Sequence, residues 1–353
     1  MADARALLLW AVTVLLGASY SRNPLYSLLL LLMTLWVYDT AGAADVVSAS
    51  TGSGRPSPLA PLRFALIAVP LGALFNALTS HFGATVLLRL PAWLPLLGGA
   101  LTLEALAFGA INGLNLTVIF SGFAAFNQAV ATRELLKLTP RAFHESGVVL
   151  SIALTFIPQT THSLHRIREA QAVRGHRLRG LRDWLPIFTP LLVSALERAL
   201  GLAEAMVARG YASVTDTAQP LRTQGLLALG LLVLLGGWLG YLFTPALRPV
   251  LLGVGALGVA LMLTALWLAG RGNRHTVYRP RRWRAQDTWI VAGCLLALGT
   301  LLSRRAWMVY SPYPQLAWPN FDPLTALGLL GLLVPGLIPA REKTRDAGEM
   351  GDE

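Results

Sequence analysis

Long apolar blocks follow one another along almost the whole chain, and they restrict its fold more than any other feature. They lie near 5–20, 25–42, 62–82, 95–128, 146–161, 224–245, 249–270, 287–303 and 323–340. Because about 20 mostly apolar residues let a helix cross the hydrocarbon core of a membrane, these blocks predict a series of transmembrane helices. Charged residues make up only 13% of the chain, compared with roughly 25% in soluble domains. We therefore predict an all-α integral membrane protein, a multi-span helical bundle.

The basic residues indicate how this bundle is oriented. The net charge is +11, but the arginines gather in two segments between apolar blocks. One segment contains Arg166, Arg168, Arg174, Arg177, Arg179 and Arg182, and the other contains Arg271, Arg274, Arg279, Arg281, Arg282 and Arg284. Cytoplasmic loops of membrane proteins are enriched in Lys and Arg, so we place both segments in the cytoplasm. Lipid head groups of the bilayer, and not nucleic acid, then account for most of the basic excess.

The side of the N-terminus is left open by the sequence. Five apolar blocks precede the first basic segment, which puts the N-terminus outside unless one block is re-entrant or lies on the membrane surface. The first block could be mistaken for a signal peptide, but a second follows almost directly, so we expect a retained helical hairpin that turns at Asn23-Pro24. Block 95–128 carries Glu104 and Asn115, which we expect to face protein at membrane depth, as packing or gating residues.

Residues 161–222 differ from the rest because charge recurs and no long apolar run is present. Pro186 and Pro190 divide this segment, so we predict two amphipathic helices, roughly 161–180 and 192–212, at or below the cytoplasmic membrane face. The segment is a cytoplasmic arm that separates the other parts of the chain. The predicted parts are N-terminal transmembrane helices (1–160), the arm (161–222), C-terminal transmembrane helices (223–340) and a polar cytoplasmic tail (341–353).

A short charged sequence, here called the cassette, occurs twice in the arm. The copies are EAQAVRG at 169–175 and EAMVARG at 204–210, with a constant spacing of 35 residues. On a helix, residues four apart share a face, so Ala170 aligns with Arg174, and Ala205 with Arg209. The glycine that follows each arginine is placed for a helix C-cap. The copies are either two ordinary basic helix ends or a duplicated anchor for a partner with two similar faces, such as a dimer.

The two cassettes resemble the paired Ala-Arg-Gly motifs of the T component of energy-coupling-factor (ECF) transporters. The stretches RNPLYSLLL, TLEALAFGAINGLNL and LSIALTFIPQTTHSLHRIREAQAVRG agree, so the resemblance covers about residues 5–245 and is strongest at 140–212. In that family the T component is a non-catalytic transmembrane scaffold. Its two cytoplasmic coupling helices dock onto a pair of ATP-binding-cassette ATPase subunits, and a small membrane protein, the S component, captures a vitamin or metal ion. The resemblance implies a subunit of an ECF-type ABC importer in the cell membrane of a prokaryote.

The resemblance also implies which residues couple to the ATPases. Arg174 and Arg209 would anchor the two coupling helices, and Gly175 and Gly210 would end them. The flanking contact residues would be Glu169, Ala170, Glu204, Ala205 and Ala208. Family members commonly end near the first span after the arm, so residues 249–353 look like an extension, about whose role the resemblance says nothing.

Other chemistry has weaker signals in the sequence. The phosphate-binding pattern GxxxxGK[ST] is missing, so ATP hydrolysis would need partner subunits, and no cofactor is implied. His162 and His165 could share a metal ion, but no third ligand is evident, so no metal site is predicted. One alternative is an integral membrane enzyme that acts on lipid or isoprenoid phosphate substrates through its arginines. Another is a secondary transporter, which usually shows inverted repeats.

Overall fold

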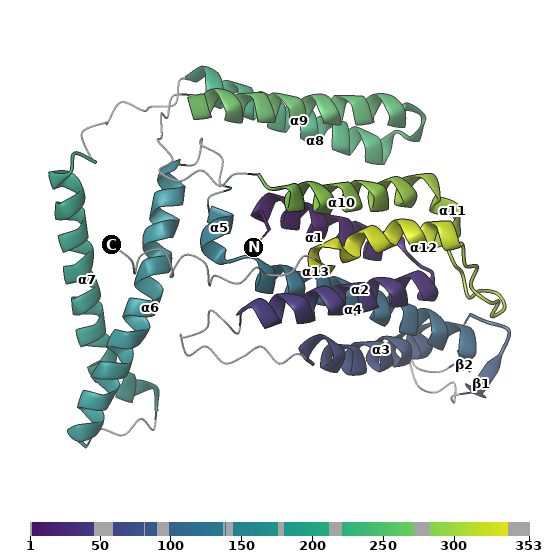
Figure 1. The fold of residues 1–353 in the computed structure, drawn as a ribbon, viewed down its shortest axis with the longest axis horizontal. Coiled ribbons are helices and arrows are strands. Elements are labelled where there is room, and N and C mark those ends of the chain that lie inside the picture. Colours follow the sequence, from purple (N-terminus) through teal and green to yellow (C-terminus); the bar gives the residue numbers. More distant parts are fainter. Residues whose placement is uncertain are drawn as a thin grey trace, which may run out of the picture. The chain divides into compact units, whose positions relative to one another are not determined.

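A computed structural model describes residues 2–45, 59–80, 82–89, 99–136, 138, 144–175, 180–211, 221–271 and 283–337. These residues are almost all helical, which confirms the predicted all-α class, and the chain forms two compact units (Figure 1). The first unit is Met1–Leu135 with Arg279–Glu353, and the second is Leu136–Tyr278. Most of the basic segment 271–284 and the tail predicted at 341–353 lie outside the described residues.

The first unit is a bundle of antiparallel helices with a small pair of strands. Its helices are α1 (Ala4–Tyr20), α2 (Pro24–Asp45), α3 (Ala60–Thr79), α4 (Leu103–Ala129), α10 (Ala285–Ser303), α11 (Arg305–Met308), α12 (Pro323–Leu329), η4 (Leu330–Leu333) and α13 (Val334–Leu337). The strands β1 (Val86–Arg89) and β2 (Ala100–Thr102) pair antiparallel. The apolar block predicted at 95–128 is not helical throughout, because it contains β2 and α4 begins only at Leu103, with the Thr102 side chain as its cap.

The second unit contains two helical pairs. Helix α6 (His144–Val173) packs with α7 (Leu185–Ala208), which follows the short helix η2 (Leu181–Trp184). Helix α8 (Leu221–Phe243) packs with α9 (Arg248–Arg271) through the turn η3 (Pro245–Leu247). The short helix α5 (Thr132–Leu136) leads from the first unit to the second.

Six described helices are long and apolar enough to cross a membrane. The segments are Pro24–Gly42, Ala60–Thr79, Leu103–Ala129, Arg222–Phe243, Pro245–Gly270 and Ala285–Ser303, and Ala4–Tyr20 and Pro323–Leu337 are shorter apolar helices. The apolar block predicted at 146–161 is not among these segments. That block is the first part of α6, which runs through Pro158 to Val173 without a break.

Contacts inside the first unit show which helix ends lie together. The Asp3 N–H donates to Asp287 Oδ1 at 2.7 Å, which joins the starts of α1 and α10. Gly42 near the end of α2 lies against Gln128 near the end of α4, because a Cβ atom added to Gly42 would be 3.1 Å from Gln128 Nε2. Because α2 returns to the end of the bundle where α1 begins and ends beside α4, the chain leaves α4 at that same end.

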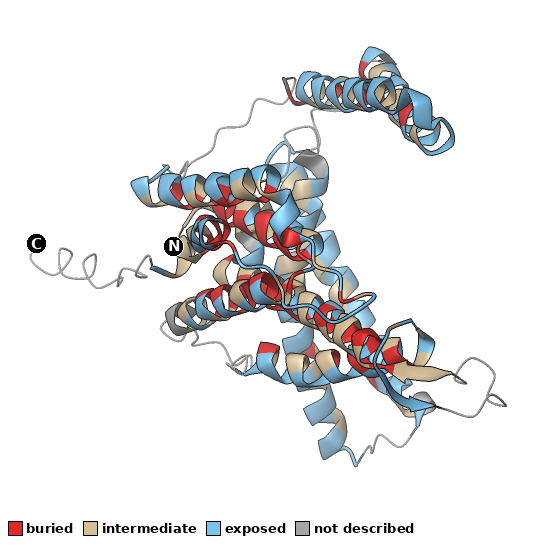
Figure 2. Ribbon diagram, turned by 90° about the vertical axis from the view of Figure 1, so that its right-hand side faces the viewer, coloured by how far each residue is buried: buried red, intermediate tan, exposed pale blue. Residues whose placement is uncertain are grey.

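The core of the first unit combines the two ends of the sequence. Trp10, Tyr26, Ile290 and Leu332 are all buried in one cluster, and the Trp10 Nε1–H donates to Leu332 O at 2.8 Å. Figure 2 shows buried residues in red where these helices meet. Residues 285–337, which belong to the predicted extension, are therefore a structural part of the N-terminal bundle.

Candidate functional site

The two cassettes lie at the C-terminal ends of the two helices of the arm. The first covers the last turns of α6, and the second covers the last turns of α7. All the coupling residues implied by the resemblance are exposed: Glu169, Ala170, Arg174, Gly175, Glu204, Ala205, Ala208, Arg209 and Gly210. The structure thus presents both copies on a surface, each at a helix tip.

The glycine of each cassette ends its helix, as predicted. The φ angles of Gly175 and Gly210 are +78° and +76°, in the left-handed region that glycine enters without a Cβ penalty. The Gly210 N–H donates to Val207 O at 2.9 Å and the Tyr211 N–H donates to Met206 O at 3.0 Å. These two bonds are the Schellman pattern, which satisfies carbonyls at a helix end. The backbone thus turns away directly after each arginine and leaves it at the tip.

The same backbone geometry occurs at the end of α6. The Gly175 N–H donates to Ala172 O at 3.0 Å, which is the first of the two Schellman bonds seen in α7. Arg174 and Arg209 therefore occupy matching positions, one residue before a glycine of positive φ. A guanidinium at a helix C-terminus is also favoured by the helix dipole, so the position of each arginine stabilises the end of its own helix.

Helices α6 and α7 cross one another (Figure 1). Arg198 Nη2 donates to Ser163 Oγ at 3.2 Å, and Gln171 Nε2 donates to Pro186 O at 3.5 Å. The residue later in α6, Gln171, contacts the residue earlier in α7, Pro186, so the two helices run antiparallel. An open groove of about 600 Å³ lies at the crossing, lined by Ser163, Arg166, Ile167, Ala170, Ser194, Glu197 and Arg198.

The break between the two arm helices is not where the prolines predicted it. Helix α6 ends at Val173 rather than near 180, and α7 begins at Leu185 rather than near 192. Pro186 stands in the first turn of α7, where its missing N–H costs nothing. Pro190 lies inside the helix and lacks the N–H that would bond the carbonyl four residues back. That carbonyl belongs to Pro186, and it accepts from Gln171 of α6 instead.

An apolar row on α7 begins before the second amphipathic helix predicted at 192–212, so sequence reasoning missed its first residues. Its residues recur at helical spacing and are all exposed: Leu185, Phe188, Leu192, Leu196 and Leu200. The spacing of three and four residues was a readable signal of one apolar face. These side chains form one exposed apolar face along α7.

The polar residues predicted as packing or gating candidates make packing contacts. The Glu104 carboxylate accepts from the Thr85 N–H at 3.0 and 3.2 Å, which ties the segment before β1 to α4. Asn115 Nδ2 donates to Ser21 O at 2.7 Å, which ties α4 to the end of α1. Both contacts therefore join separate parts of the bundle.

Metal-ligating side chains do not gather within the described part of the chain. No group of three or more His, Cys, Asp or Glu residues there is placed to hold a metal ion. His162 and His165, the pair noted in the sequence, are both exposed on α6.

Comparisons with known proteins agree with the motifs. A family model described as cobalt transport protein (CbiQ) matches residues 3–221. A protein of Staphylococcus aureus is 36% identical over 93 residues, which are 25% of this chain and 34% of that protein. Proteins of Exiguobacterium sibiricum and Lactococcus lactis subsp. cremoris are each 42% identical over 74 residues, which are 19% of this chain and 28% of those proteins.

All three relatives carry the name energy-coupling factor transporter transmembrane protein EcfT. The matched segments span 28–34% of the length of each relative, whereas the family model extends over more than half of this chain. Its apolar helices are those of a multi-pass membrane protein. The chain belongs to the cobalt transport protein (CbiQ) family, whose members are the T components of ECF transporters.

Proposed function

We propose that this chain is the transmembrane scaffold of an ECF-type ABC importer in a bacterial cell membrane. In this proposal the arm lies in the cytoplasm, and each cassette docks onto one subunit of an ATPase pair. A separate S component in the membrane captures the solute, a vitamin or a metal ion. The observation that carries the proposal is the pair of exposed cassettes at the tips of two crossing helices.

The chemistry of the tips supports docking. Arg174 and Arg209 are exposed, and a guanidinium presents a planar fork that bonds carboxylates or carbonyls in fixed geometry. The neighbouring Ala170 and Ala205 are small and exposed, so another surface can approach each helix closely. Two similar tips fit a partner that has two similar grooves.

The mechanism is mechanical. ATP binding by the partner pair closes its two subunits, and each subunit moves the cassette docked to it. Because α6 and α7 are continuous helices that meet at a crossing, movement of their tips changes the angle between them. The apolar row on α7 gives the arm a face for the membrane or for an apolar partner, through which this motion reaches the S component.

The test is to remove both arginines and measure ATPase association. We expect Arg174→Ala with Arg209→Ala to leave membrane insertion unchanged and to abolish co-purification of the ATPase subunits in mild detergent. A hydrogen bond to a charged group contributes about 1.5–3 kcal/mol. The loss of two such bonds weakens association by more than about a hundredfold.

A matched control separates docking from simple loss of charge. Arg168→Ala with Arg222→Ala removes the same charge from exposed positions outside the cassettes, and this variant should retain the ATPase subunits. Wild-type recovery of ATPases by the cassette variant would show that docking occurs elsewhere. Purification of the wild-type chain alone, stable and homogeneous, would instead favour a membrane enzyme that acts on lipid or isoprenoid phosphates.

A further inference from the structure

The 35-residue spacing of the cassettes also separates the two residues that meet where the arm helices cross. Ser163 and Arg198 are also 35 residues apart, each at the same distance before its cassette, and they are hydrogen-bonded to each other at 3.2 Å. Ser163 is buried in this contact, with 5% of its surface exposed. In a pair of elements related by a two-fold axis, a residue meets its own equivalent on the axis. The crossing has this property.

The two tips are placed symmetrically about that crossing. Arg174 follows Ser163 by 11 residues, and Arg209 follows Arg198 by 11 residues, or about 16 Å along a helix that rises 1.5 Å per residue. Because the helices run antiparallel, the tips point in opposite directions from the crossing. The matching φ angles of Gly175 and Gly210 give both tips the same backbone geometry.

The bonds at the crossing show which residue joins the helices. Arg198 Nε donates to Ser194 O of its own helix at 3.1 Å, which orients the guanidinium, and its Nη2 reaches Ser163 on α6. Arg166 Nη2 also donates to Ser163 Oγ, at 3.5 Å, but from the same helix. Arg198 therefore bridges α6 and α7, whereas Arg166 does not. The open groove beside this bond leaves room for the helices to change their angle while they keep this contact.

We propose that the Ser163–Arg198 hydrogen bond is a pivot on a local two-fold axis of the arm, and that Arg198 is the positioning residue that holds the two cassettes at equal distances from this axis. Its role in transport rests on the proposed function, because a two-fold ATPase pair requires two equally placed tips. The pivot itself is a property of this chain and can be measured without the partners.

The test measures the distance between the tips in the full-length chain in detergent. Spin labels are attached to Ala172→Cys and Val207→Cys, which are exposed and again 35 residues apart, while the native Cys294 is buried. Pulsed electron spin resonance then gives the distribution of tip-to-tip distances. We expect one narrow peak with Arg198 in place and loss of that peak in Arg198→Ala. Ser163→Ala removes the acceptor but keeps the bond of Arg198 to Ser194, and it should give the same loss.

Arg166→Ala is the matched control, because it removes a guanidinium from the same hydroxyl without removing the bridge, and it should keep the narrow peak. Melting temperatures of all variants check that the chain stays folded. An unchanged peak in Arg198→Ala or in Ser163→Ala overturns the pivot, as does an equal loss in Arg166→Ala. Failure of the wild-type chain to recover ATPase subunits would overturn the proposed function and would leave this distance result unaffected.

Discussion

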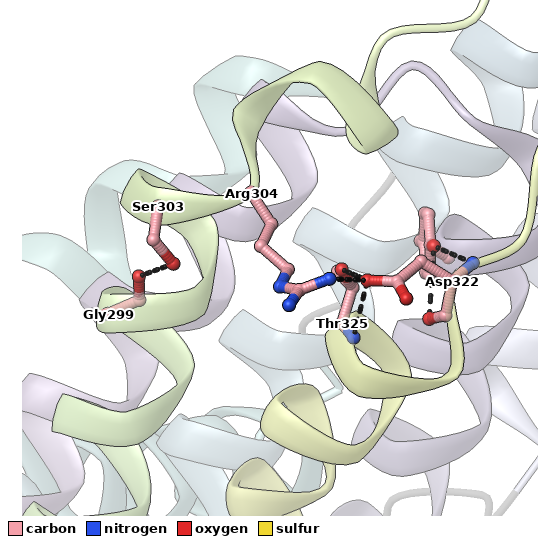
Figure 3. Close-up of polar contacts among 6 residues, drawn as sticks. Gly299, Ser303, Arg304, Asp322 and Thr325 are labelled. Atoms are coloured by element: carbon pink, nitrogen blue, oxygen red, sulfur yellow. Dashed lines mark hydrogen bonds and ion pairs between the residues drawn. The ribbon is translucent and has the colours of Figure 1, made fainter.

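At the scale of single residues, one carboxylate ties the C-terminal segment into the bundle. Asp322 Oδ2 accepts from Arg304 Nη1 at 2.8 Å and from the Thr325 hydroxyl at 2.6 Å (Figure 3). It also accepts from the Thr325 N–H at 3.2 Å as the N-cap of α12. The backbone N–H of Asp322 donates to the Tyr26 hydroxyl at 2.8 Å. One residue thus links the junction of α10 and α11, the start of α12 and the N-terminal α2.

The first prediction concerns this carboxylate. Asp322→Ala removes the cap and the ion pair, so it should lower the melting temperature of the detergent-solubilised chain. Asp322→Asn keeps a side chain that can cap a helix but loses the ion pair with Arg304. Its melting temperature should therefore fall less than that of Asp322→Ala. Equal losses in the two variants would show that the cap contributes nothing.

The same site has an expected pH dependence. The hydroxyl of Thr325 and the guanidinium of Arg304 hold the pKa of Asp322 below its ordinary value. A carboxylate with a depressed folded-state pKa stabilises the fold fully above its unfolded pKa of about 3.9 and loses this contribution as pH falls through the folded-state pKa. The difference in melting temperature between wild type and Asp322→Asn should therefore be constant near neutral pH and shrink below about pH 4.

At the scale of elements, glycines bring α3 and α4 close together. A Cβ atom on Gly113 would lie 2.5 Å from Ala68 O, and one on Gly72 would lie 2.8 Å from Gly109 O. In membranes, small residues allow helix backbones to approach, and van der Waals packing then replaces the hydrophobic driving force. These two helices depend on the absence of side chains at their contact.

The second prediction follows from this packing. Gly113→Val should separate α3 from α4 and lower stability by about 1–3 kcal/mol, the usual cost of overpacking. Gly299→Val on α10 is the control, because a Cβ there meets nothing within 4 Å. Thermal unfolding in detergent measures both variants. Similar melting temperatures for the two would mean that α3 and α4 can shift apart without loss.

Local signals in the sequence predicted the elements better than long-range contacts did. Arg-Gly at the end of each cassette predicts a helix end because the cap uses only neighbouring residues, and Gly175 and Gly210 have the expected backbone. Pro190 suggested a helix break, but α7 continues through it. The Pro186 carbonyl that Pro190 cannot bond accepts a hydrogen bond from α6. The Ser163–Arg198 bond also depends on how two helices pack, which periodicity along one of them does not reveal.

At the scale of the whole molecule, the two ends of the sequence fold together while the segment between them forms a separate unit. Trp10 of α1 is 1% exposed and donates to Leu332 of η4, and Asp3 bonds Asp287 of α10. The arm and the α8–α9 pair belong to the other unit. The segment after the arm, which looked like an extension, thus has two parts with different structural roles.

The last prediction distinguishes these parts by deletion. Truncation after Phe243 removes α9 to α13, which leaves buried Trp10 and Tyr26 without the residues that cover them, so the chain should aggregate or be degraded although its cassettes are intact. Deletion of Leu221–Arg271 removes α8, η3 and α9 but no helix of the first unit. Since two spans are lost, α10 still enters the membrane from the same side, and the contacts of Trp10 and Asp3 are kept. Yield and monodispersity in size-exclusion chromatography should therefore be normal for the internal deletion and poor for the truncation. A well-behaved truncated chain would mean that α1 to α4 form a stable bundle without the C-terminal helices.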